Sequence, residues 1–107
     1  MASIAAQKAA HATLVANTQD DVTLSGVGMT ITIANYGATT DIISYRIGTV
    51  AGNITSPTAP PASDDYKIVG GQVHTLSVPN IGVVIVKLKS AQAPAYSVQA
   101  IPHDPRN

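Results

Sequence analysis

The chain has 107 residues and contains no cysteine, no glutamate, no phenylalanine and no tryptophan. Without cysteine there is no disulfide framework, no thiolate nucleophile and no cysteine-ligated zinc. Glutamate favours helices and aspartate favours turns, so six aspartates without one glutamate indicate little helix. The core must be aliphatic, and any aromatic stacking platform must use one of the four tyrosines, which are Tyr36, Tyr45, Tyr66 and Tyr96.

Charge and long apolar runs are also scarce. Six acidic and six basic residues give a formal net charge of zero, and no run of lysine or arginine exists. An electrostatic grip on nucleic acid is therefore not expected. No stretch approaches the ~20 apolar residues of a membrane span. The alanine-rich start lacks a basic segment and is interrupted by Lys8, so it does not match a signal peptide. We expect neither nucleic-acid nor membrane contact.

What the chain does contain is β-branched residues: eleven valines, eleven isoleucines and eleven threonines, which fit a pleated sheet. Short apolar or alternating runs between turn residues predict strands at 11–16, 22–25, 29–33, 42–47, 64–69, 73–79, 82–88 and 96–98. The prediction is an all-β chain, a single antiparallel β-sandwich of seven to eight short strands with an extended N-terminal arm.

The length suits one domain, with flanking segments at both ends. We expect the arm at residues 1–10, the β-sandwich domain at 11–101 and a C-terminal tail at 102–107. The arm either orders against a neighbouring subunit or is a frayed terminus.

Alternation within the strands predicts which side chains face inward. The inward set of two strands is Met29, Ile31, Ile33, Ile43, Tyr45 and Ile47. Ser44 and Arg46 are expected on the outer face. Residues 83–86 are apolar on both faces, which is typical of a central strand, and Lys87 and Lys89 mark where it emerges into water. Residues 48–63 contain three prolines and form a long loop, and such loops are functional or mobile.

The three histidines, His11, His74 and His103, lack the spacing of metal ligands. His74 has the same parity as Leu76, which favours a histidine at the end of the sandwich or at an interface. No nucleophile motif or phosphate loop accompanies them. We expect no enzyme activity and no small-molecule substrate.

Two aspartate pairs are the remaining candidates for chemistry. Asp20-Asp21 and Asp64-Asp65 would suit Ca²⁺ if all four carboxylates met. An aspartate before a strand more often ends a turn, and no calcium-loop pattern surrounds either pair. The prediction is therefore that the chain holds no metal and no other cofactor.

The order of the strand segments resembles that of the small β-sandwich virion proteins of tailed bacteriophages. Members of that group tend to show a Val-Thr-Leu-Thr-Gly start, a proline-containing loop, an Asp-Asp-x-Tyr-like entry and a Val-Val-Lys-Leu … Tyr-Ser-Val finish. The corresponding stretches here are Val22-Thr23-Leu24-Ser25-Gly26, the strands at 30–35 and 42–48, Asp64-Asp65-Tyr66, residues 76–79 and 84–90, and Tyr96-Ser97-Val98. The resemblance covers about residues 22–100.

This resemblance implies a capsid decoration (cement) protein, located on the virion surface and assembled in the host cytoplasm. Its partners would be the major capsid protein and copies of itself, as a homo-oligomer, and it would reinforce capsomer junctions. We expect the arm and the long loop to supply the interface, through Ile4, Lys8, Leu14, Tyr36, Ile54, Pro57 and Pro60. The alternatives are a tail- or neck-associated protein, or a receptor- or glycan-binding virion module that uses Tyr36 and the long loop.

Overall fold

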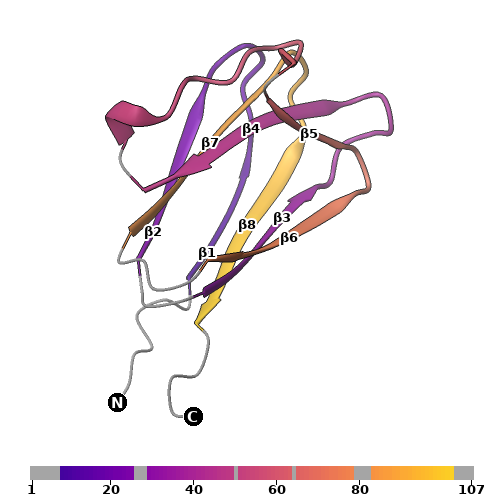
Figure 1. Ribbon diagram of the computed structural model, residues 1–107. Coiled ribbons are helices and arrows are strands. Elements are labelled where there is room, and N and C mark those ends of the chain that lie inside the picture. The colour runs from indigo at the N-terminus through magenta and orange to yellow at the C-terminus, as the bar shows by residue number, and fades with distance from the viewer. Residues whose placement is uncertain (1–7, 26–28, 50, 64, 79–82, 103–107) are drawn as a thin grey trace.

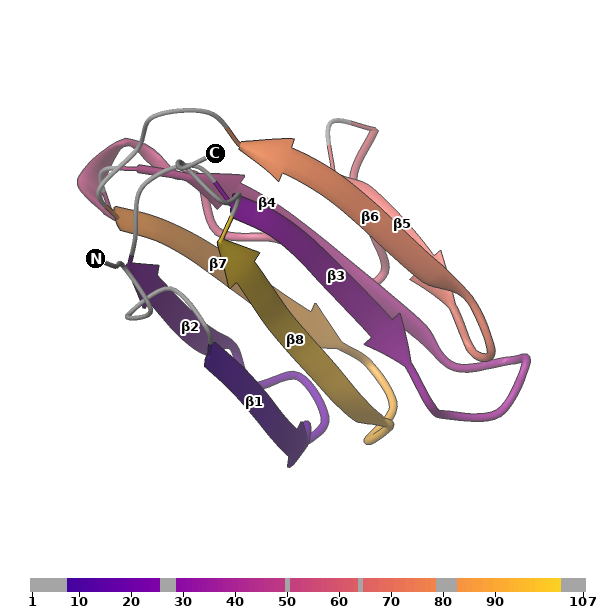
Figure 2. The same ribbon diagram turned by 90° about the horizontal axis from the view of Figure 1, so that it is seen from below.

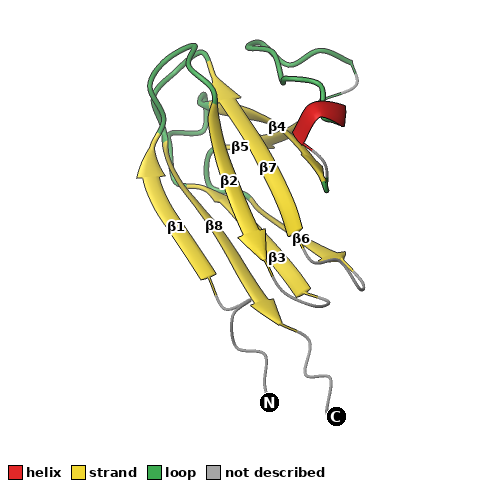
Figure 3. Ribbon diagram, turned by 90° about the vertical axis from the view of Figure 1, so that its left-hand side faces the viewer, coloured by secondary structure: helices red, strands yellow, loops and turns green. Residues whose placement is uncertain are grey.

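The structure is a computed structural model, and it describes residues 8–25, 29–49, 51–63, 65–78 and 83–102. These residues form an all-β fold of eight strands with one short 3-10 turn (Figures 1 and 3). The strands are β1 (Lys8–Thr13), β2 (Asp20–Ser25), β3 (Met29–Asn35), β4 (Ile42–Gly48), β5 (Tyr66–Val69), β6 (Val73–Val78), β7 (Val83–Ser90) and β8 (Ala95–Pro102), and the 3-10 turn is Ala51–Asn53. The predicted fold class is confirmed.

The strands pair as if one long hairpin had been rolled up. β1 pairs with β8, β2 with β7, β3 with β6 and β4 with β5, all antiparallel. Two further pairings, β3 with β8 and β4 with β7, complete two sheets. Sheet A has the order β1-β8-β3-β6 and sheet B the order β2-β7-β4-β5, and the two layers face each other in Figure 2. This is the double-sheet jelly-roll arrangement of a β-sandwich.

The core lies between the two sheets, where alternate side chains of each strand meet. Ile31 and Ile33 of sheet A and Ile43 and Tyr45 of sheet B are buried, as their alternation predicts, and Ile47 packs against them. β7 is a central strand of sheet B, also as predicted. The complete buried cluster is Leu14, Val22, Leu24, Ile31, Ile33, Ile43, Tyr45, Ile68, Val84, Val86, Leu88, Tyr96, Val98 and Ala100.

Each lateral edge of the sandwich carries one tyrosine hydrogen bond between the sheets. Near the β5–β6 edge, the Tyr45 hydroxyl lies 2.8 Å from Nδ1 of His74. On the β1–β2 side, the Tyr96 hydroxyl donates to Oδ2 of Asp20 across 3.0 Å. Burial, followed by the hydrogen bond to Asp20 and its charge, raises the pKa of Tyr96 to about 12. Burial and then the adjacent Tyr66 raise the pKa of Tyr45.

Asn35 and Gly70 hold together one end of the sandwich, where the chain passes between the sheets. The buried Asn35 amide donates to the carbonyls of Ile68 (2.9 Å) and Asp41 (3.0 Å) and accepts from the Gly37 amide. A Cβ at Gly70 would lie 1.8 Å from the carbonyl oxygen of Ala38. Only glycine allows this approach of two backbones, so this end is fixed by local chemistry.

The first strand begins earlier than the sequence predicts. Lys8 pairs with Ala100 in β1, whereas the prediction places the first strand at 11–16. The strand ends at Thr13, so Leu14 turns into the core, with its amide bonded to the carbonyl of Pro94. Residues 1–7 of the predicted arm and 103–107 of the predicted tail lie outside the described residues. Because Lys8 is paired with Ala100, the chain enters β1 and leaves β8 at the same end of sheet A.

Candidate interaction surfaces

The outer face of sheet A carries threonine, serine, alanine and glutamine side chains, two exposed aliphatic side chains and one histidine. Across the strands, the register aligns Ser77 with Thr30 and Ile101, then Thr75 with Thr32, Gln99 and Ala9, then Val73 with Ala34, Ser97 and His11. No lysine, arginine or aspartate occurs in these three rows. Val73 and Ile101 are each 56% exposed, while Ala34 and Ser97 are buried between their neighbours. The result is a face without lysine, arginine or aspartate, bordered by two apolar side chains.

The outer face of sheet B is basic. One row aligns Lys67 with Ser44 and Lys89, and the next aligns Arg46 with Lys87 and Asp21. Four of the six basic residues of the chain therefore share one face. No contiguous run in the sequence indicates this cluster, because it depends on the register of three strands.

Ser44 lies on the predicted outer side of β4, but it is not exposed to water. It is 0% exposed, since Lys67 and Lys89 flank it in the neighbouring strands. Its hydroxyl has no hydrogen-bond partner among the described residues. The prediction that Ser44 lies on the outer face is thus confirmed, although its neighbours cover it.

The segment between β4 and β5 corresponds to the long loop predicted at residues 48–63. Part of it lies on this basic face, which the sequence does not predict. The Lys87 ammonium donates to the carbonyl of Ile54, and Ile54 contacts the position where Gly48 would carry a Cβ. This contact explains why Lys87 does not emerge fully into water. The loop therefore belongs to the packing of sheet B.

Asp65 is the hydrogen-bond centre of that loop. Its fully buried carboxylate accepts from Nε of Arg46 (2.6 Å), from the amides of Thr58 (3.0 Å) and Ala62 (2.9 Å), and from the Thr58 hydroxyl (3.1 Å). Burial acts to raise the pKa of Asp65, but the hydrogen bonds from Thr58, Ala62 and Arg46 outweigh it and lower the pKa to about 2. Asp65 is therefore an anion at all ordinary pH values, with a structural role.

The predicted interface residues do not form one surface. Leu14 is 1% exposed and Pro57 is also buried, so both contribute to packing rather than to a docking face. Tyr36 is 61% exposed and lies at the end of the sandwich where β4 begins, whereas Ile54 lies near the end of β4. Pro60 is exposed on the loop. Ile4 lies outside the described residues, and of Lys8 only the backbone pairing is described.

The other candidates for chemistry remain apart. Asp20 and Asp21 belong to β2 and Asp65 precedes β5, which are opposite edges of sheet B, about 14 Å apart at ~4.8 Å per strand. Asp64 lies outside the described residues. Within the described part of the chain, no group of three or more metal-binding side chains comes together. His74 faces the core side of β6, next to Tyr45, which agrees with its parity.

Comparison with known proteins gives no relative: no family model, no curated protein and no solved structure matches the chain. The resemblance to bacteriophage virion proteins therefore stays a hypothesis. The described residues also contain no helix with the length and apolar character needed to cross a bilayer.

Proposed function

We propose that the chain is a structural protein of a bacteriophage virion, a capsid decoration protein that docks through the outer face of sheet A. The observation that carries this proposal is the neutral character of that face. Burying an unpaired charge in an interface costs far more than burying an alanine methyl, or a threonine or serine hydroxyl that finds a hydrogen-bond partner. Among the described residues, this face is the one broad sheet surface without a lysine, arginine or aspartate in its rows.

The outer face of sheet A is too small to form a stable interface alone. Four strands at ~4.8 Å spacing and about six residues at ~3.3 Å rise give it roughly 400 Å². A stable interface of standard size needs about 800 Å² from each partner. A second contact must therefore supply the remaining interface area. β1, which begins at Lys8, is an edge strand of this same sheet. We propose that the N-terminal arm expected from the sequence supplies that contact.

Many copies on a repeating shell strengthen such a contact. A decoration protein that touches two shell subunits at once stabilises their junction by mass action, without any chemistry. The basic face of sheet B then points away from the shell. That orientation leaves the Arg46–Asp65 ion pair, the Lys87 contact with Ile54 and the exposed Lys67 as they are in the free chain, so docking removes no further water from these charges.

Co-sedimentation with shells assembled without this chain tests the proposal. We expect saturable binding of hundreds of copies per shell. Thr75→Arg places a charge on the outer face of sheet A, and Thr23→Arg places the same charge on the outer face of sheet B. Both threonines are exposed and both belong to an edge strand, so they form a matched pair.

The first variant should lose shell occupancy at least tenfold, because its charge would be buried on docking, and the second should bind as the unmodified chain does. Equal occupancy of the two variants would refute docking through sheet A. A handful of copies per particle would instead assign the chain to the neck or tail, and no binding at all would remove it from the virion.

A further inference from the structure

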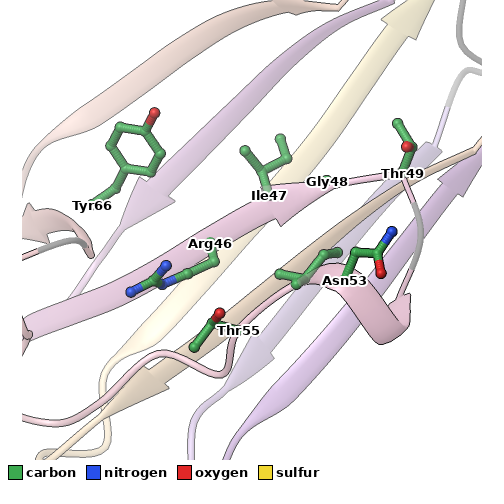
Figure 4. A pocket seen from close by; sticks show the side chains of 8 residues that line it. Arg46, Ile47, Gly48, Thr49, Asn53, Thr55 and Tyr66 are labelled. Atoms are coloured by element: carbon green, nitrogen blue, oxygen red, sulfur yellow. The ribbon is translucent and has the colours of Figure 1, made fainter.

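The free end of β4 borders a hollow of about 350 Å³, which is within the range of small-molecule sites. β5 has only four residues and pairs with β4 from Ile42 to Tyr45. From Arg46 to Gly48, β4 therefore has a strand neighbour on the β7 side and none on the other among the described residues. The chain that leaves β4 turns back through Ala51–Asn53 and forms the opposite wall (Figure 4).

Tyr66 gives the hollow an aromatic wall that is already held in place. Its ring stacks on Tyr45 with centroids 5.3 Å apart and an interplanar angle of 25°, and yet 56% of the residue is exposed. A stacked ring loses little freedom when a ligand packs on it. The apolar C–H face of a sugar ring is a suitable partner for an exposed tyrosine.

Arg46 gives the hollow a positioned guanidinium, which is part of an ion pair with Asp65. The bond to Asp65 uses one of the five N–H donors of the guanidinium and fixes the side chain, which is 23% exposed. Because the pKa of Asp65 is about 2, this positioning persists at neutral pH. A guanidinium with further donors is matched to a carboxylate group.

The remaining polar lining is neutral and suits hydroxyl groups. Thr49, Asn53 and Thr55 are exposed around the opening, and together they offer two hydroxyls and one amide, each able to donate and accept. Ile47 supplies an apolar patch on the same side of β4 as Tyr66, while Arg46 and Thr55 lie on the other side (Figure 4). No acidic side chain lines the hollow.

We propose that this hollow binds a saccharide unit that carries a carboxylate, such as a uronic acid residue of a surface polysaccharide. The unit lies across the free edge of β4: its ring packs on Tyr66 on one side of the strand, its carboxylate pairs with Arg46 on the other side, and its hydroxyls bond to Asn53 and Thr55. The site lies on sheet B, so it stays open when sheet A is docked, and it does not depend on the proposed docking.

Titration of the isotopically labelled full chain with sodium glucuronate, followed by amide NMR shifts, tests this site. We expect shifts confined to residues 46–49, 53–55 and 66, with a dissociation constant on the order of 1 mM. Glucose lacks the carboxylate and acetate lacks the ring, so each should bind at least fivefold more weakly. No shift up to about 50 mM glucuronate, or equal binding of acetate, would overturn the proposal.

Variants locate the binding on the chain. Tyr66→Ala should weaken glucuronate binding at least tenfold, whereas Tyr36→Ala, which removes the similarly exposed tyrosine outside the hollow, should leave it unchanged. Asn53→Ala changes an exposed side chain of the 3-10 turn and should weaken binding at least threefold without altering the melting temperature. If Tyr36→Ala weakens binding as much as Tyr66→Ala, the site is elsewhere and the inference is wrong.

Discussion

The two outer faces of the sandwich differ in charge and in covering. Sheet A presents rows of threonine, serine and alanine with Val73 and Ile101 at its border. Sheet B presents four basic side chains, and the loop between β4 and β5 is bonded onto it through Lys87 and Asp65. Burying a charged face that a loop already covers costs more than burying an uncovered face whose hydroxyls can find hydrogen-bond partners. This contrast is the basis of our proposal that sheet A docks and that sheet B stays accessible to water and small ligands.

The largest effect is expected from removing the anchor of the loop on sheet B. Asp65→Ala leaves Arg46 and the Thr58 and Ala62 amides without their acceptor. We expect a loss of about 3 kcal/mol in the free energy of unfolding, measured by urea titration. Asp21→Ala, at an exposed carboxylate on the same face, should change it by less than about 0.5 kcal/mol. Equal losses would show that the loop is not held by Asp65.

Acid should remove part of the same stabilisation. The pKa of Asp65 is about 2 in the folded chain against an ordinary value of 3.8, so the folded state binds this proton less tightly than the unfolded state. Its contribution is complete above about pH 5 and is lost as the pH falls through about 2. Asp65→Asn lacks this titration. The stability gap between the unmodified chain and Asp65→Asn should therefore shrink from pH 5 to pH 2, and a constant gap would contradict the role of the carboxylate.

A smaller effect is expected where the two sheets are joined at their edges. Tyr96→Phe removes a hydrogen bond to the charged Asp20 and should cost about 2 kcal/mol, while Tyr45→Phe removes the contact with His74 and should cost about 1 kcal/mol. Tyr36→Phe, at an exposed ring, is the control and should change little. Thermal unfolding of the three variants checks the order, and a reversed order between the first two would contradict it.

The smallest effect is expected from the paired surface substitutions. Thr75→Arg and Thr23→Arg should each change the free energy of unfolding by no more than about 0.5 kcal/mol, because both side chains are exposed on edge strands. Urea titration of both checks this. If both variants are as stable as the unmodified chain, a difference between them in shell occupancy is caused by docking. If Thr75→Arg is much less stable, its loss of occupancy could come from unfolding instead.

Much of the fold follows from the sequence because strand alternation is a local property. The inward positions of Ile31, Ile33, Ile43 and Tyr45 are predicted from a period of two and are confirmed. The pairing of distant strands is not local, so neither the rolled-hairpin topology nor the order of the sheets could be predicted.

The surfaces are harder to predict for the same reason. Arg46, Lys67, Lys87 and Lys89 lie up to 43 positions apart, and only the register brings them onto one face. The buried state of Asp65 depends on where the loop returns, so its sequence position before a strand indicates only a turn. The interface prediction for Leu14 follows from its place in the N-terminal region, and it is wrong because β1 ends at Thr13 and Leu14 turns into the core.

The absence of cysteine allows the most direct test of the central claim, which is that sheet A docks and sheet B does not. Thr75→Cys and Thr23→Cys each introduce the single thiol of the chain, one on each outer face. Maleimide labelling of this chain is measured free and bound to shells. We predict that Cys at position 75 labels at least tenfold more slowly when bound, while Cys at position 23 labels at an unchanged rate. Protection at position 23 with free labelling at position 75 would contradict the account.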